Sequence, residues 1–247
     1  MKKGVVLVMT VLLAVGLFGC SAPATQGTSP SNEGSSSTTQ TASGTPHDLV
    51  ITDSNYTISS SGYVHYVVEI TNPNDGFLSE YATIEVVGKH PDGTIAFSDD
   101  WVISGLTPGS TTYWANQAGG GDAIPEDTIE ISLSVNDRNW TASKQTVPAN
   151  LYTFDNLSAK PQSFGSGITV TGEITLTEDL TLESGHSLTG PMLVCVLRDS
   201  AGKITAGFEG FMFKDLTTGK PTAFEISSTF DVGDYATAEM HANPWGY

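Results

Sequence analysis

Alternation of apolar and polar residues is the feature of this sequence that most restricts its fold. Between Val64 and Thr71 every second residue is apolar, and residues 129–135 and 168–176 follow the same rule. A period of two places the apolar side chains on one face of a β-strand. Few segments show the period of an amphipathic helix, and Gly and Pro interrupt the chain at short intervals. The sequence therefore predicts an all-β protein.

Two copies of one strand pattern follow each other along the chain. About seven strands in about 100 residues is the density of an immunoglobulin-like β-sandwich. A tandem duplication explains the repeated features better than one large domain does. We expect two tandem immunoglobulin-like β-sandwich domains, at residues 47–146 and 147–247, with Pro148 interrupting the chain near their boundary. Residues 92–95 correspond to 201–204, 106–109 to 216–219, and Trp140 to Trp245.

The first 20 residues have the layout of a secretory signal. Lys2 and Lys3 give a positive start, and an uncharged apolar run extends from Gly4 to Phe18. That run has about 15 residues, fewer than the roughly 20 that a permanent membrane-spanning helix needs. Cys20 stands at the point where the composition changes to Ser, Thr, Pro and Gly. Cleavage before Cys20 is the prediction, with an uncleaved anchor or a cut elsewhere as alternatives.

The residues at the cut, Leu17-Phe18-Gly19-Cys20, resemble the lipobox of bacterial lipoproteins. The resemblance implies that the Cys20 thiol receives a diacylglyceryl group and becomes the mature N-terminus. The protein would then be lipid-anchored at the extracytoplasmic face of the cell membrane. Residues 21–46 contain one charged residue, Glu33, and no apolar residue larger than Ala. Such a segment cannot offset its ordering entropy by burial, so we expect a disordered tether spanning on the order of 30 Å.

The charge balance restricts the partners. The chain carries a formal net charge of −17, and removal of Lys2 and Lys3 with the signal leaves 8 basic against 27 acidic side chains, or −19. Such a surface is repelled by nucleic acid and by anionic lipid headgroups. We therefore expect no nucleic-acid partner. Solubility explains the acidity better than capture of cations or basic proteins does.

Two short motifs resemble the FxLYD-type family of bacterial extracytoplasmic domains. Residues 69–72 (EITN) match the end of one family strand, and residues 197–203 (LRDSAGK) match its D-x-x-G-K hairpin. In the first copy, residues 89–93 (KHPDG) replace the L-Y-D core of that motif. The resemblance implies an immunoglobulin-like fold and an envelope location. It carries no catalytic residues over to this chain.

No catalytic constellation is evident in the sequence. Cys195 lies in a run in which residues at both odd and even positions are apolar. This predicts a strand that is buried on both faces, with Cys195 as a buried side chain and not a nucleophile. Ser200 and Lys203 match S-x-x-K, but they fall in a predicted hairpin turn without the companion motifs S-D-N and K-T-G. The sequence therefore predicts a protein that is not an enzyme.

Metal and cofactor motifs are also lacking in the sequence. The five His residues are scattered, and no paired Cys or H-E-x-x-H occurs. Carboxylates gather at Asp99-Asp100 and at Glu178, Asp179 and Glu183, without the alternating spacing of a calcium loop. Solvated surface is the better interpretation of both groups. We expect no metal and no cofactor.

Aromatic residues give the one weak indication of a binding site. Trp101 follows Asp99 and Asp100, and Tyr113 precedes Trp114, so one residue of this aromatic pair must face away from the core of its sheet. Exposed Trp or Tyr beside carboxylates stacks on sugar rings or anchors a protein interface. The candidate binding residues are therefore Trp101, Tyr113, Asp99 and Asp100. The alternative is a core role, which we favour for Trp140 and Trp245 because the repeat places them alike.

Three functions are consistent with these patterns to different degrees. The leading hypothesis is a non-enzymatic, lipid-anchored envelope protein that binds another protein or a glycan or acts as a spacer. The alternative is a solute- or glycan-binding lipoprotein that works with an envelope transporter, although the βαβ alternation expected of such receptors is missing. A cell-wall hydrolase is the third, and it would need an acid–base pair that the sequence does not reveal.

Overall fold

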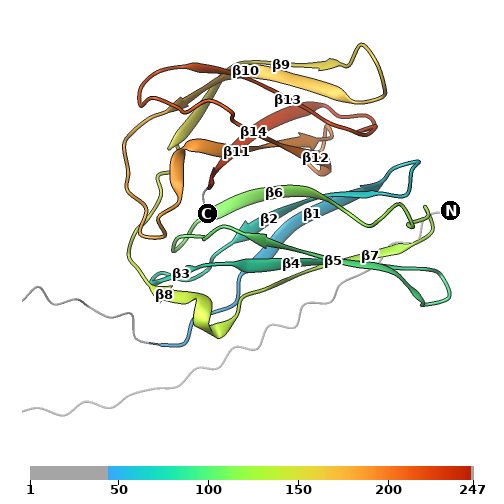
Figure 1. Cartoon of the computed structure of the whole chain (residues 1–247), viewed down its shortest axis with the longest axis horizontal. Coiled ribbons are helices and arrows are strands. Elements are labelled where there is room, and N and C mark those ends of the chain that lie inside the picture. The colour runs from blue at the N-terminus through green and yellow to red at the C-terminus, as the bar shows by residue number, and fades with distance from the viewer. Residues whose placement is uncertain (1–43, 246–247) are drawn as a thin grey trace, which may run out of the picture. The chain divides into compact units, whose positions relative to one another are not determined.

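Strands dominate residues 44–245, which are the part of the chain described by this computed structural model (Figure 1). The expected all-β sandwich fold is confirmed. Within the described residues the only helix is a single 3₁₀ turn, η1 (Asp137–Asn139). No helix there has the length and hydrophobicity needed to cross a bilayer. The predicted signal, Cys20 and nearly all of the predicted tether fall outside the described residues.

The strands divide into a first half, β1 to β8, and a second half, β9 to β14. The first half contains β1 (Val50–Ile58), β2 (Val64–Thr71), β3 (Phe77–Ser79), β4 (Ala82–Lys89), β5 (Ile95–Ile103), β6 (Thr111–Ala118), β7 (Thr128–Ser134) and β8 (Trp140–Ala142). The second half contains β9 (Tyr152–Pro161), β10 (Ile168–Leu176), β11 (Ser187–Arg198), β12 (Ile204–Phe211), β13 (Thr222–Ser227) and β14 (Thr237–Trp245). Residues 143–151 connect them, and the predicted boundary falls in this connection.

The two halves are built from the same pair of antiparallel sheets. The first half has the strand orders β1-β2-β6 and β5-β4-β7, plus a small β3-β8 pair. The second has the orders β9-β10-β13 and β12-β11-β14. In chain order, β9, β10 and β13 are thus the counterparts of β1, β2 and β6, and β11, β12 and β14 are those of β4, β5 and β7. Two of the sequence correspondences make similar backbone pairings, with partners that differ by two residues in the second half. Leu106 N donates to Ser79 O as Leu216 N donates to Thr189 O, and Trp140 pairs with Ser79 as Trp245 pairs with Ser187.

The two halves are in contact, with one sheet of each packed face to face against the other. The β1-β2-β6 sheet packs on the β12-β11-β14 sheet, which makes four layers in all (Figure 1). Val67 of β2 and Val194 and Val196 of β11 are fully buried and belong to one hydrophobic cluster. Both β2 and β11 are therefore covered on both faces. One face of each strand packs inside its own half, and the other face packs against the neighbouring half.

The stacking is asymmetric, and equivalent places differ in burial and, at some of them, in residue type. The inner β12-β11-β14 sheet corresponds to β5-β4-β7, which is an outer layer. Ile204 at the start of β12 is fully buried, whereas Ile95 at the start of β5 is 66% exposed. Glu85 of β4 is exposed on the outer layer, whereas β11 is buried from Met192 to Leu197. Polar residues on the outer layer thus favour an end to the stack after two halves.

Candidate functional site

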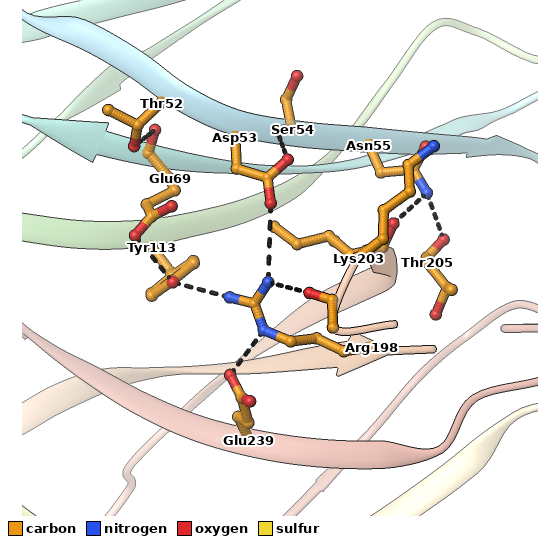
Figure 2. A network of polar contacts seen from close by, with 12 residues as sticks. Thr52, Asp53, Ser54, Asn55, Glu69, Tyr113, Arg198, Lys203, Thr205 and Glu239 are labelled. Carbon is orange, nitrogen blue, oxygen red and sulfur yellow. Dashed lines mark hydrogen bonds and ion pairs between the residues drawn. The ribbon is translucent and has the colours of Figure 1, made fainter. Parts of the chain in front are cut away.

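Arg198 is the centre of a polar network that joins the two halves (Figure 2). It lies at the end of β11, with its side chain 15% exposed. Its Nε donates to Glu239 Oε2 at 2.9 Å, one terminal nitrogen donates to Tyr113 Oη at 2.9 Å, and the other donates to Gly202 O at 3.0 Å. The same nitrogen that reaches Gly202 lies 3.6 Å from Asp53 Oδ2. Asp53 and Tyr113 belong to the first half, so the guanidinium connects both halves.

Tyr113 extends this network across the stacked sheets. Its hydroxyl donates to Glu69 Oε1 at 2.9 Å and accepts from Arg198. Its ring lies 4.1 Å from the ring of His241, centroid to centroid, with a tilt of 36°. Burial and the hydrogen bond to Glu69 raise the pKa of Tyr113 to about 12, so the phenol stays neutral at pH 7.

Two asparagines make further hydrogen bonds between the halves. Asn243 Nδ2 donates to Tyr113 O at 2.6 Å, and its Oδ1 accepts from Thr112. Asn55 Nδ2 donates to the backbone oxygen of Thr205 at 2.8 Å. Tyr113, Thr112 and Asn243 all lie on the edge strands β6 and β14 of the two stacked sheets. Asn55 and Thr205 lie on β1 and β12, the opposite edge strands, so hydrogen bonds join the two stacked sheets at both edges.

A groove of about 480 Å³ lies beside β6 and β14, where the two halves meet. We call it the junction groove. It is bounded by the segment before β6, by β6 and β14, by the connection between the halves, and by the start of β9. Its lining is Ile103, Ser104, Gly105, Leu106, Thr107, Gly109, Ser110, Thr111, Thr112, Tyr113, Trp114, Val147, Pro148, Ala149, Leu151, Tyr152, Phe154, Leu182, Ser184, Met240, His241, Ala242, Asn243 and Pro244.

The junction groove is electrically neutral in a strongly acidic protein. None of its lining residues is Asp, Glu, Lys or Arg, although the chain has 27 acidic side chains. Burial lowers the pKa of His241, and it raises the pKa of Tyr152, so neither carries a charge at pH 7. His241 Nε2 is buried without a hydrogen-bond partner among the described residues. The groove therefore offers apolar surface and a few polar atoms to an uncharged ligand.

The predicted binding residues do not form one site. Trp101, Asp99 and Asp100 line a second, smaller opening of about 250 Å³ at the edge of the first half, together with Tyr66, Val86, Gln117 and Ala118. Tyr113 lies instead in the contact between the halves and lines the junction groove. Trp114 is the core member of that aromatic pair, with 1% exposure. Cys20, the predicted lipidation site, lies outside the described residues.

The other chemical candidates occupy structural positions. Cys195 is fully buried in β11, and burial raises the pKa of its thiol to about 12. Glu183 Oε2 accepts from Ser143 Oγ at 2.5 Å, and Asp179 accepts from Thr218, so each carboxylate fastens a loop. Within residues 44–245, no three His, Cys, Asp or Glu side chains are grouped so that they could hold a metal ion.

The junction groove was not predicted from the sequence, although two uncharged stretches of the sequence are a signal for it. Residues 101–121 contain no Asp, Glu, Lys, Arg or His, and neither do residues 145–154. In a chain with so many carboxylates, long uncharged stretches mark surface that is protected or reserved for an uncharged ligand. Both stretches contribute to the groove.

Comparison with known proteins does not assign the chain to a family. No family model matches it, and a search of curated proteins finds no match. The likeness to the FxLYD-type family and to lipoprotein signals therefore depends on the short motifs alone.

Proposed function

We propose that this protein is a non-enzymatic, lipid-anchored envelope protein that binds an uncharged ligand or a neutral segment of a partner in the junction groove. The single observation that carries the binding role is the neutral groove of about 480 Å³ where the halves meet. Pockets of about 300–1,000 Å³ with an apolar lining and a few polar groups are typical ligand sites, and they favour domain interfaces.

The placement outside the cell is supported by the sequence. The lipobox-like residues end at Cys20, and a long polar stretch separates them from the first strand. A net charge of −19 in the mature chain suits a soluble module held near an anionic membrane without adhering to it. A solute- or glycan-binding role in partnership with a transporter stays as the alternative, and the groove would serve it equally well.

Replacement of the lipidation site gives the first prediction. Cys20→Ala is expected to move the protein from the membrane fraction to the soluble fraction or to stop its maturation, because the acyl chains supply the membrane affinity. Cell fractionation with metabolic fatty-acid labelling measures both effects. Cys195→Ala is the matched control, since it removes the other cysteine and is expected to leave labelling unchanged. Equal labelling of wild type and Cys20→Ala would rule out this anchor.

Obstruction of the junction groove gives the second prediction. Ala149 is exposed and lines the groove, so Ala149→Trp fills its mouth without disturbing a buried contact. Ala201→Trp adds the same side chain in an exposed turn of the second half, away from the groove. Native mass spectrometry of protein purified from envelopes is expected to show a bound mass in wild type and Ala201→Trp that Ala149→Trp lacks. The bare mass in all three proteins would favour a spacer over a binding protein.

A further inference from the structure

Most polar side chains that line the junction groove already have a hydrogen bond inside the protein. The hydroxyl groups of Ser104 and Ser110 donate to backbone oxygens at 3.3 Å and 2.7 Å, and that of Tyr152 donates to a backbone oxygen at 2.9 Å. Such a bond is also made by Thr111, Thr112, Tyr113 and Asn243. A hydroxyl group that donates inside the protein has no proton left for a ligand.

The backbone along one wall of the groove is also engaged. Asn72 is fully buried, and its Nδ2 donates to Leu106 O at 2.9 Å and to Thr107 O at 3.2 Å. Gly105 N donates to His186 Nε2 at 3.3 Å. A ligand that lies against this wall therefore meets polar atoms that already have partners.

Apolar side chains supply much of the remaining lining. They are Ile103, Leu106, Trp114, Val147, Pro148, Ala149, Leu151, Phe154, Leu182, Met240, Ala242 and Pro244. Among the polar lining residues, Thr107 Oγ1 and His241 Nε2 are buried without a hydrogen-bond partner in the described part of the chain. The groove thus has unused polar atoms for one small polar group but not for a ligand that carries many.

Ligand classes differ in how they meet such a lining. A sugar has a hydroxyl group on most of its ring carbons, and a peptide has an amide at every residue. Each of these groups would lose its water on entering the groove and would find few free donors there, which weakens binding. An aliphatic chain has no such groups, and each CH₂ that it buries raises the affinity about fourfold. A glycan or a peptide therefore fits the groove by volume but not by chemistry.

Charge restricts the head group of an aliphatic ligand. The groove lining has no Lys or Arg to pair with an anion and no Asp or Glu to pair with a cation. The whole chain has a formal net charge of −17, which also repels anionic lipids. The head group that these charges favour is therefore neutral.

We propose that the junction groove binds the aliphatic chain of a neutral lipid such as a monoacylglycerol. The chain enters past the exposed Ala149 and contacts the buried side chains of Leu151 and Met240. The hydroxyl groups of its head stay in water at the mouth of the groove. This inference rests on the function proposed above, because the lipid anchor would hold the groove beside a membrane that supplies such lipids.

Photolabelling of the full chain in phosphatidylcholine vesicles tests this proposal. The lipid probe is a monolauroylglycerol with a diazirine on its acyl chain. N-acetylglucosamine and a capped alanine dipeptide, each with the same diazirine, are the comparison probes. Peptide mapping of the wild type is expected to find the lipid label within residues 103–114, 147–154 or 240–244, which line the groove.

Three variants identify the place and the chemistry of the labelling. Ala149→Trp is expected to lose most of the lipid label, because its side chain fills the mouth of the groove. Ala201→Trp is expected to retain it, because that turn lies away from the groove. Tyr152→Phe is also expected to retain it, because the Tyr152 hydroxyl donates to Leu188 O and not to the ligand. Circular dichroism of each variant confirms that it is folded.

The outcomes separate this inference from the proposed function. Lipid label in the groove that Ala149→Trp removes supports the inference, and lipid label that Ala149→Trp leaves unchanged would overturn it. Excess dodecyl phosphate is expected to displace the label less than unlabelled monolauroylglycerol does, and equal displacement would contradict a neutral ligand. Groove label from the sugar or the peptide probe without lipid label would overturn the inference and leave the proposed binding function intact. Lack of groove label from all three probes would contradict both.

Discussion

Gly207→Ala is expected to lower the free energy of unfolding by about 2–3 kcal/mol, because the contact between the halves has no space for another carbon. Gly207 lies in β12 and faces the first half. A Cβ atom built on it would lie 2.7 Å from Val67 Cβ, 2.8 Å from Val67 Cγ2 and 3.0 Å from Cys195 O. The neighbours belong to the central strands β2 and β11, which cannot move without disturbing their sheets. Urea denaturation measures the loss.

A matched variant and a double variant identify the cause. Gly190→Ala adds the same methyl group in β11 where no atom lies within 4 Å, and it is expected to cost little. Val67→Ala removes the γ-methyl groups that face Gly207. The double variant Gly207→Ala with Val67→Ala is expected to be about 1 kcal/mol more stable than the sum of the two single changes, since neighbouring sites couple. Strict additivity would show that the γ-methyl groups of Val67 do not press on the added carbon, since Val67 Cβ, 2.7 Å from it, is kept in the double variant.

The sequence predicted the strands but not the contact between the halves, and β2 shows the reason. Its polar residues His65 and Glu69 share a face with Val67, which favours a solvent-facing surface. In the structure that face is covered by the second half. His65 stacks on Phe230 with ring centroids 3.9 Å apart, and Glu69 accepts from Tyr113 of its own sheet, whose hydroxyl accepts in turn from Arg198 of the second half. The period-two pattern does not distinguish polar residues that have partners at the contact between the halves from polar residues that face solvent. Only β11, apolar at both parities, indicated a strand buried on both faces.

The candidate site was predictable only where its residues are neighbours in the sequence. Asp99, Asp100 and Trp101 are adjacent in β5, and they were identified as candidates from that adjacency. The junction groove joins Thr112 and Tyr113 to Asn243, which lies 130 positions further along the chain. No local pattern records a contact over that separation. Tyr113 was identified for its adjacency to Trp114, but its partners Glu69, Arg198 and His241 could come only from the fold.

Two buried groups at the contact between the halves are expected to make the free energy of unfolding depend on pH in opposite directions. Glu209 of β12 has Oε2 buried without a hydrogen-bond partner among the described residues, and burial raises its pKa from 4.5 to about 7. His65 of β2 is 8% exposed, and burial lowers its pKa from 6.5 to about 4. Both groups are therefore mostly neutral in the folded protein between about pH 4 and pH 7.

The two groups change stability in opposite directions. Folded Glu209 keeps a proton that the unfolded chain releases, so its contribution to stability falls as the pH rises from 4.5 to about 7. Unfolded His65 takes up a proton that the folded protein excludes, so stability falls as the pH drops from 6.5 to about 4. Each shift is worth about 2–3 kcal/mol, and in the wild type the two contributions nearly cancel across this range.

Single substitutions are expected to separate these contributions. Glu209→Gln should match the wild type near pH 4.5 and exceed its free energy of unfolding by about 2–3 kcal/mol at pH 8, because the cost of ionising a buried carboxyl is gone. His65→Phe, which keeps a ring against Phe230, should match the wild type at pH 8 and exceed it by a similar amount near pH 4. Urea denaturation at pH 4, 4.5, 6 and 8 measures both differences. Glu85→Gln removes one exposed carboxylate from the outer layer and corrects for the change in net charge. A difference between Glu209→Gln and wild type that stays constant with pH would mean that Glu209 is solvated, and the contact between the halves would then be open at β12.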